Sequence, residues 1–164
     1  MGRAFKRVGS ESIRASLSTD ELDLLRGLPE QLKSVLEEGD ADPANDRLFP
    51  PAYLDVEETE ANEEYRRLMH AELIEGKMAA LGLLASSLER ATRRGSRWSV
   101  ELSEEEALAW LNVLNDIRLT LGVRLDVTDD LDGDIDPDDP RAPGFQLLYY
   151  LGWLEEHLLA ALSA

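Results

Sequence analysis

A group of polar side chains able to hold a ligand lies in the second half of the chain. Asn112, Asn115, Asp116 and Arg118 place amides, a carboxylate and a guanidinium close together, and Arg141 follows further on. Asn115 and Arg118 are one helical turn apart, so they share a face of any helix formed here. Such groups usually brace neighbouring loops through hydrogen bonds. The alternative is a pocket for a small ligand or a substrate.

Residues 129–141 form an acidic loop rich in aspartate. Alternating carboxylates can bind calcium, but an EF-hand loop needs glycine at its sixth position and glutamate at its twelfth. Counted from Asp130, those positions hold Ile135 and Arg141, so we interpret the loop as solvated. Neither histidine has metal-ligand spacing on a helix, and no phosphate-binding or nucleophile motif is found. We expect no metal, no cofactor and no catalytic residue.

Basic side chains concentrate in two stretches that the fold can bring together. One interpretation is structural, with arginines stabilising a helix end and protecting a sheet edge. The other is a docking site for an acidic protein or for nucleic acid, with Arg7, Arg14, Arg94 and Arg97 as contacting groups. The two stretches contain Arg3, Lys6, Arg7 and Arg14, then Arg90, Arg93, Arg94 and Arg97.

The elements that position these groups are mostly helices. Capping boxes at residues 18–21 and 103–106 each begin a leucine-rich helix. We expect Pro29 to kink or break the first helix and Gly76 to divide the second helical region. About five helices result. The helical regions run to about residue 38, from 59 to about 94, from 104 to 121 and from 143 to about 162.

The predicted buried sides of these helices follow the apolar periodicity. They include Tyr65, Leu68 and Leu108 along with the leucine stripes. On the last helix, Tyr149 and Trp153 face more than one side, so part of that surface suits a protein interface.

Three short strands complete the predicted fold. Residues 5–8 and 12–17 read as a hairpin, and residues 97–102 read as a third strand that pairs with it. The fold class is therefore mainly α, of the α+β type, with a helical bundle and a three-stranded antiparallel sheet. In this single domain of residues 1–164, the hairpin spans 1–17, a long packed loop spans 40–58 and the acidic loop spans 129–141.

Composition narrows the function classes. The chain has 164 residues, 34 acidic and 17 basic, and a formal net charge of −17, which repels nucleic acid and anionic membranes at long range. It has no cysteine, so disulfides, thiolate zinc sites and thiol switches are excluded. The N-terminus lacks the apolar region of a signal peptide, and no stretch reads as a membrane span. We expect a cytoplasmic protein.

Several segments of the chain carry a resemblance: residues 47–53 (RLFPPAY), 64–68 (EYRRL), 76–77 (GK), 110–125 (WLNVLNDIRLTLGVRL) and 139–143 (DPRAP), followed by the last helix with Trp153-Leu154. Together they resemble an actinobacterial family of unknown function that includes oxidative-stress regulators of the AosR type. The resemblance covers nearly the whole chain and implies action through a transcription partner, such as an alternative sigma factor, rather than catalysis. It also implies thiol-based sensing. This chain has no cysteine, so it cannot sense oxidants by forming a disulfide.

The leading hypothesis is a non-enzymatic regulatory protein that acts on transcription through a protein partner. The alternatives are an adaptor or structural subunit in protein turnover, and a small-ligand-binding protein or enzyme that uses Asn115, Asp116 and Arg118. Direct binding to nucleic acid ranks last, because no helix-turn-helix with a basic recognition helix is visible. Assembly into a homo-oligomer stays open.

Overall fold

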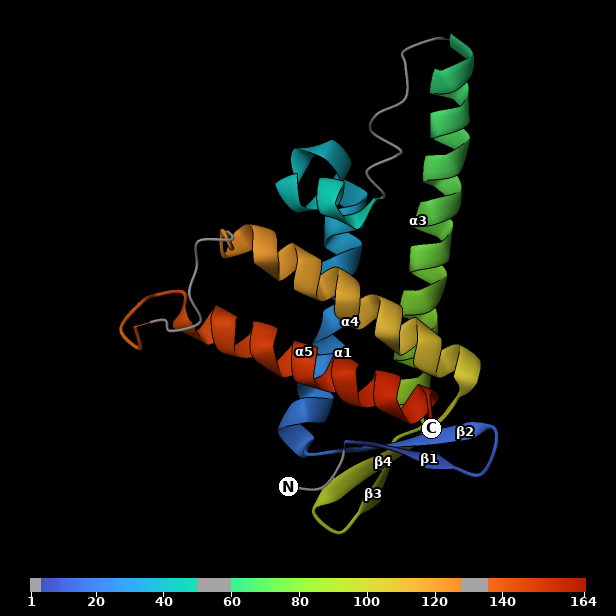
Figure 1. Ribbon diagram of the computed structural model, residues 1–164, viewed down its shortest axis with the longest axis vertical. Helices are drawn as coiled ribbons and strands as arrows, with labels where there is room; N and C mark the ends of the chain where they lie inside the picture. Colours follow the sequence, from blue (N-terminus) through green and yellow to red (C-terminus); the bar gives the residue numbers. More distant parts are fainter. Residues whose placement is uncertain (1–3, 50–59, 128–135) are drawn as a thin grey trace.

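The computed structural model describes residues 4–49, 60–127 and 136–164. Helices form most of the described chain, and a small sheet closes one end of the helical body (Figure 1). The mainly helical α+β prediction is confirmed. In chain order the elements are β1 (Phe5–Val8), β2 (Ser12–Leu17), α1 (Thr19–Glu38), the 3₁₀ helices η1 (Gly39–Ala41) and η2 (Pro43–Leu48), α3 (Glu60–Glu89), β3 (Thr92–Arg94), β4 (Arg97–Ser103), α4 (Glu104–Arg124) and α5 (Ala142–Leu162).

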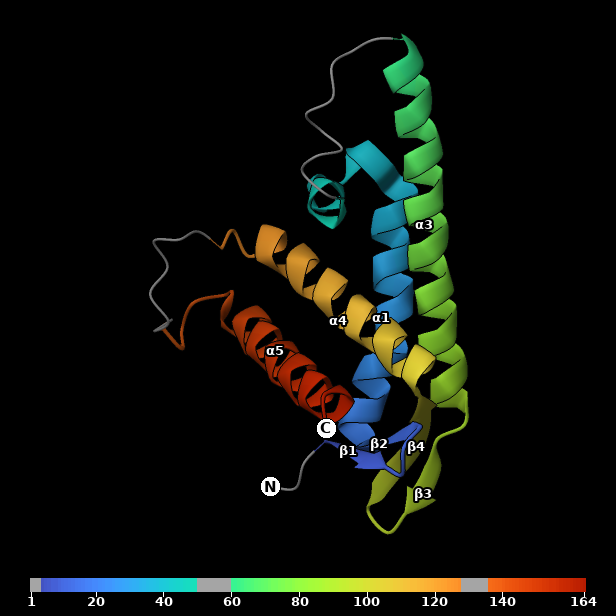
Figure 2. The same cartoon turned by 45° about the vertical axis from the view of Figure 1, so that its right-hand side comes forward.

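The sheet is antiparallel in the order β1-β2-β4-β3, so β1 and β3 form its two edges. Side chains alternate between its faces. Ile13, Ala15 and Leu17 on β2 are fully buried, and their partners on β4 include Val100 and Leu102. The helices all pack on this apolar side, as Figures 1 and 2 show, so the opposite face is left uncovered.

Both predicted capping boxes are confirmed. The Ser18 hydroxyl accepts a hydrogen bond from the Glu21 amide at 3.1 Å, and the Glu21 carboxylate accepts one from the Ser18 amide at 2.9 Å. Ser103 and Glu106 repeat the arrangement at the start of α4. Because each box satisfies amides that lack helical partners, it sets where the chain leaves the sheet and becomes helix.

The prediction of three strands was short by one. We had assigned residues 92–94 to the end of the second helix, but α3 ends at Glu89 and these residues pair with β4. The turn between β3 and β4 has two residues, and Gly95 takes φ 64° in it. A left-handed glycine at the first turn position is what such short hairpins favour. The hydrogen bonds between β3 and β4 therefore outweigh the helix propensity of Arg93 and Arg94.

The expected breaks at Pro29 and Gly76 were wrong, while the alternative of a kink at Pro29 stays a prediction. α1 runs as one helix through Pro29, and α3 runs as one helix of 30 residues through Gly76. At Pro29 tertiary packing overrides the propensity, because Leu28 and Leu32 on either side of the proline are fully buried.

Three residues predicted to be buried are exposed. Tyr65 and Leu68 leave 56% and 64% of their surface accessible, because the N-terminal half of α3 extends beyond α4 and α5 (Figure 2). Leu108 is 51% exposed on the outer side of α4. The packing of α3 into the main core begins only near Leu73.

The centre of the core is Trp110. Its side chain is fully buried, its ring meets Phe5 edge-on with centroids 6.0 Å apart, and its indole N–H donates to the Ser87 hydroxyl at 2.7 Å. One residue of α4 thereby joins β1 and α3.

The predicted long loop is partly helical. η1 and η2 occupy its first half, and Leu48 and Phe49 are buried as expected, while residues 50–58 lie outside the described residues. The centre of the acidic loop, residues 128–135, lies outside them as well. None of the described helices has the length and apolar content needed to cross a membrane.

Candidate functional site

The predicted polar group on α4 divides between two sides of the helix. On one side the Lys77 ammonium of α3 lies 2.9 Å from the Asp116 carboxylate, which is 7% exposed, and Asn112 lines the same shallow hollow. Burial raises the pKa of Asp116, and the Lys77 hydrogen bond offsets this only in part. Arg141 lies elsewhere: it donates to the Leu125 carbonyl at 3.1 Å.

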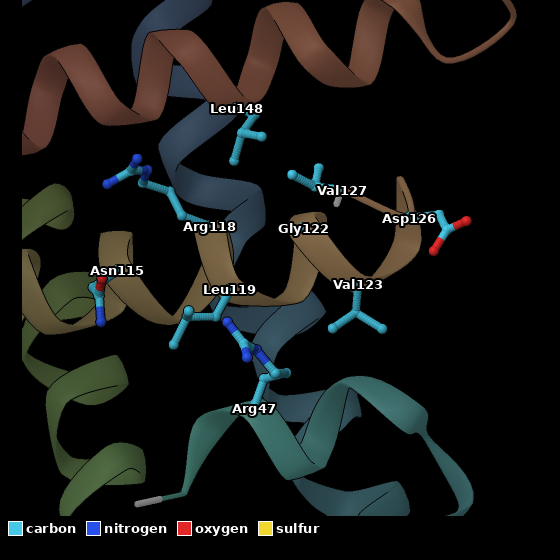
Figure 3. A pocket seen from close by; sticks show the side chains of 9 residues that line it. All are labelled: Arg47, Asn115, Arg118, Leu119, Gly122, Val123, Asp126, Val127 and Leu148. Atoms are coloured by element: carbon cyan, nitrogen blue, oxygen red, sulfur yellow. The ribbon is translucent and has the colours of Figure 1, made fainter. Parts of the chain in front are cut away.

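On its other side α4 forms the floor of a groove of about 750 Å³, flanked by α5 and η2 (Figure 3). Asn115 and Arg118 both line it, as their one-turn spacing predicted. We call it the α4 groove. Its lining residues are Arg47, Asn115, Arg118, Leu119, Gly122, Val123, Asp126, Val127 and Leu148.

Arg118 is held against α5. Its Nη1 donates to the Glu155 carboxylate, and its Nε is buried without a partner in the described residues. A Cβ at Gly152 would lie 3.3 Å from Nη2 and 3.4 Å from Cζ. Glycine at this position therefore leaves room for the flat guanidinium to lie on the helix.

Arg47 reaches the groove from η2, which the body holds firmly. Asn45 is buried and donates to the Val35 carbonyl at 3.2 Å. Asp42 accepts from the Ala44 amide at 2.9 Å and from Arg124 at 2.8 Å. The backbone that carries Arg47 is thus fixed to both α1 and α4.

The uncovered sheet face is the second candidate. Strand alternation places Lys6, Arg14, Arg94 and Arg97 on it, with Glu101 as the acidic side chain among them. We call this the open sheet face.

Some of its cations are already engaged. Arg14 pairs with Glu101 at 2.9 Å, and Arg97 donates to the Ser16 carbonyl at 2.8 Å. Lys6 and Arg94 are exposed and have no ion-pair partner within the described residues. The face therefore keeps an excess of positive charge.

The other predicted docking arginine, Arg7, lies on the opposite face of the sheet, in register with Ile13. It donates to the carbonyls of Ala161 and Leu162 at 3.1 and 2.9 Å, and it meets Glu104 at 3.3 Å. Arg7 thus caps the C-terminal end of α5, where carbonyls lack helical partners. The structural interpretation gave strand arginines such as Arg7 the protection of a sheet edge, whereas Arg7 binds a helix end.

The two aromatic interface candidates lie in different surroundings. Tyr149 is 57% exposed. Trp153 is half-buried between Tyr150 and His157, with ring centroids 6.2 and 4.2 Å away. Tyr150 continues this row to α1, where its hydroxyl donates to Glu21.

The Tyr150–Glu21 contact shifts both titrations. Burial and the hydrogen bond to Glu21 raise the pKa of Tyr150. Burial raises the pKa of Glu21, but hydrogen bonds from Tyr150 and Ser18 outweigh it and leave that pKa below its usual value.

Other residues of these sites were not singled out as site residues. Arg47 and Lys77 stood only within the resembling segments, and nothing local marked Gly152 or Glu155. Their roles come from α5 and η2 lying against α4, which neighbouring residues do not determine. Within the described residues no three metal-ligating side chains come together.

A family model described as "Domain of unknown function (DUF2017)" matches residues 2–162. The chain belongs to this family. The oxidative stress regulator AosR of Mycobacterium tuberculosis is 30% identical over 159 residues, which cover 90% of this chain and 69% of AosR. The AosR protein of Mycobacterium leprae is 29% identical over 162 residues, covering 92% of this chain and 70% of that one. No solved structure matches the chain.

The resemblance to the AosR family is therefore confirmed. Three of the segments that carried it contribute residues that lie at α4 in this DUF2017 protein. Residues 47–49 lead from η2 past the groove, Lys77 pairs with Asp116, and Arg141 binds the end of the helix at Leu125.

Proposed function

We propose that this DUF2017 protein is a non-enzymatic regulator that acts on transcription through a protein partner, such as an alternative sigma factor. The names of its AosR relatives support a regulatory role, over nine-tenths of the chain. Because the chain has no cysteine, the proposed regulation works without a disulfide switch.

The observation that carries the docking part of the proposal is the open sheet face. A chain of net charge −17 keeps Lys6, Arg14, Arg94 and Arg97 together on a surface that no described helix covers. Such a local reversal of sign attracts an acidic patch of a partner and orients it. The remaining acidic surface repels nucleic acid at long range, so the proposed partner is a protein.

Partner identity is tested by cross-linking mass spectrometry in the native organism. We expect cross-links between a transcription component and Lys6 at the sheet edge. Cross-links to a protease or its adaptor would instead support a role in protein turnover. Recovery of neither sigma factor nor polymerase would count against the transcriptional proposal.

The docking face is tested with the double variant Lys6→Glu/Arg94→Glu. Both side chains are exposed and unpaired among the described residues, so their reversal leaves the fold intact. We expect the association rate with the captured partner to fall about tenfold or more at low salt. Arg26→Glu on α1 is the matched control and should change the rate little. An unchanged rate for the double variant would exclude this face.

A further inference from the structure

We propose that the α4 groove binds a small organic monoanion, a carboxylate on an apolar body of several carbon atoms. This site lies apart from the open sheet face and is independent of the proposed partner. A cavity of about 750 Å³ has the size of small-molecule pockets. Its walls combine the apolar side chains of Leu119, Val123, Val127 and Leu148 with four polar or charged side chains.

The two cations of the groove differ in how they are paired. Glu155 neutralises Arg118, whereas Arg47 has neither an ion-pair nor a hydrogen-bond partner within the described residues. Arg47 also sits on a 3₁₀ helix that is anchored by Asn45 and Asp42, so little backbone freedom is lost when it takes a ligand. A single added negative charge would pair with Arg47.

The donors at this end suit a carboxylate. A guanidinium offers planar pairs of N–H groups that match two carboxylate oxygens. Arg118 uses Nη1 for Glu155 and is still 39% exposed, and the Asn115 side chain is exposed beside it. Arg47 and Arg118 come from different elements and line the same groove, with Arg118 on the α5 side of α4 and Arg47 on the η2 side (Figure 3).

The rest of the groove selects against a second charge of the same sign. Figure 3 places Asp126 at the end away from Asn115 and Arg118. Between the two ends stand Leu119, Val123 and Leu148. A ligand with its carboxylate at Arg47 lays an apolar chain on these residues, whereas a second carboxylate would meet Asp126.

The test is an amide-resolved NMR titration of the full chain with hexanoate, compared with hexanol and with the dicarboxylate adipate. We expect hexanoate to shift resonances around Arg47 and residues 115–127, with saturation below about 20 mM, the value that a weak ligand of this size would give. Hexanol has no negative charge and adipate has two, so both should bind more weakly than hexanoate.

Arg47→Ala removes one cation of the groove without breaking an ion pair. We expect hexanoate affinity to fall at least about tenfold, because charged hydrogen bonds are lost. Arg26→Ala on α1 is the matched control and should bind as the wild-type chain does. Equal affinity for Arg47→Ala, shifts confined to other regions, or no saturable shifts with hexanoate would each overturn the proposal. These measurements use the isolated chain, so their outcome is separate from that of the partner experiment.

Discussion

At the scale of single residues, the fold assigns similar side chains to different tasks. Arg7 and Arg14 are both strand arginines, yet Arg7 caps the end of α5 and Arg14 faces solvent beside Glu101. Glu21 combines three tasks, because it closes a capping box, accepts from Tyr150 and meets Arg97 at 3.5 Å. Such shared groups couple protonation to folding.

Glu21 therefore makes stability depend on acidity. Its pKa in the folded chain lies below the usual value, so the folded state binds the proton less readily than the unfolded state. The stabilisation is present at neutral pH and is lost as the pH falls through the folded pKa. We expect Glu21→Gln, which keeps an acceptor in the capping box, to flatten the decline in Tm between about pH 6 and pH 3.

Tyr150→Phe is the companion variant. It removes the hydroxyl donor to Glu21 and lets that pKa rise, so it should flatten the same part of the curve. Identical slopes for the wild-type chain and both variants, measured by thermal unfolding, would contradict the assignment.

At the scale of elements, α4 connects the rest of the molecule. It begins at a capping box on the sheet, carries Trp110 into the core, pairs with α3 through Asp116 and with α5 through Arg118. The α4 groove lies on the side of this helix that other elements leave open. α1 is the opposite case, because it keeps a proline in its interior and relies on buried leucines.

Pro29 lowers the stability of the folded chain, and the packing of α1 compensates for this loss. It lacks an N–H, so the Leu25 carbonyl has no intrahelical partner. We expect Pro29→Ala to stabilise the chain by about 1–2 kcal/mol, because the regained helix propensity outweighs the greater freedom of the unfolded chain. Urea unfolding measures this change, with the exposed neighbour substitution Glu30→Ala as a control expected to stay within about 0.5 kcal/mol. A loss of stability in Pro29→Ala would mean that the helix needs the proline.

At the scale of the whole molecule, the excess of negative charge is the dominant feature. Nine ion pairs are formed among the described residues, but a formal charge of −17 still leaves many carboxylates to repel one another. This repulsion acts against the compact state. The open sheet face and Arg47 stand out because they are cationic within this field.

Salt should therefore stabilise the chain. Raising NaCl from about 10 mM to about 150 mM shortens the screening length from about 30 Å to about 8 Å, which weakens repulsion more than it weakens close ion pairs. We expect Tm to rise, and to rise further in the more acidic Lys6→Glu/Arg94→Glu variant. Scanning calorimetry with NaCl and KCl separates screening from specific ion binding. A falling Tm would show that the ion pairs dominate.

The sequence alone determined what depends on near neighbours. Both capping boxes, the alternation of Ile13, Ala15 and Leu17, and the apolar stripes of the helices follow from spacings of two to four residues. The mainly helical class and the family resemblance also came from the residues themselves. These features are local, so they need no knowledge of what packs against them.

Tertiary structure decided everything that depends on which elements meet. It turned Arg7 inward and Arg94 outward, exposed Tyr65, and separated Asp116 from Arg118 on two sides of one helix. The groove exists only because η2 and α5 flank α4. The physical reason is that burial, charge pairing and cavities are set by contacts between distant segments, and those contacts outweigh propensities of about 1 kcal/mol per residue.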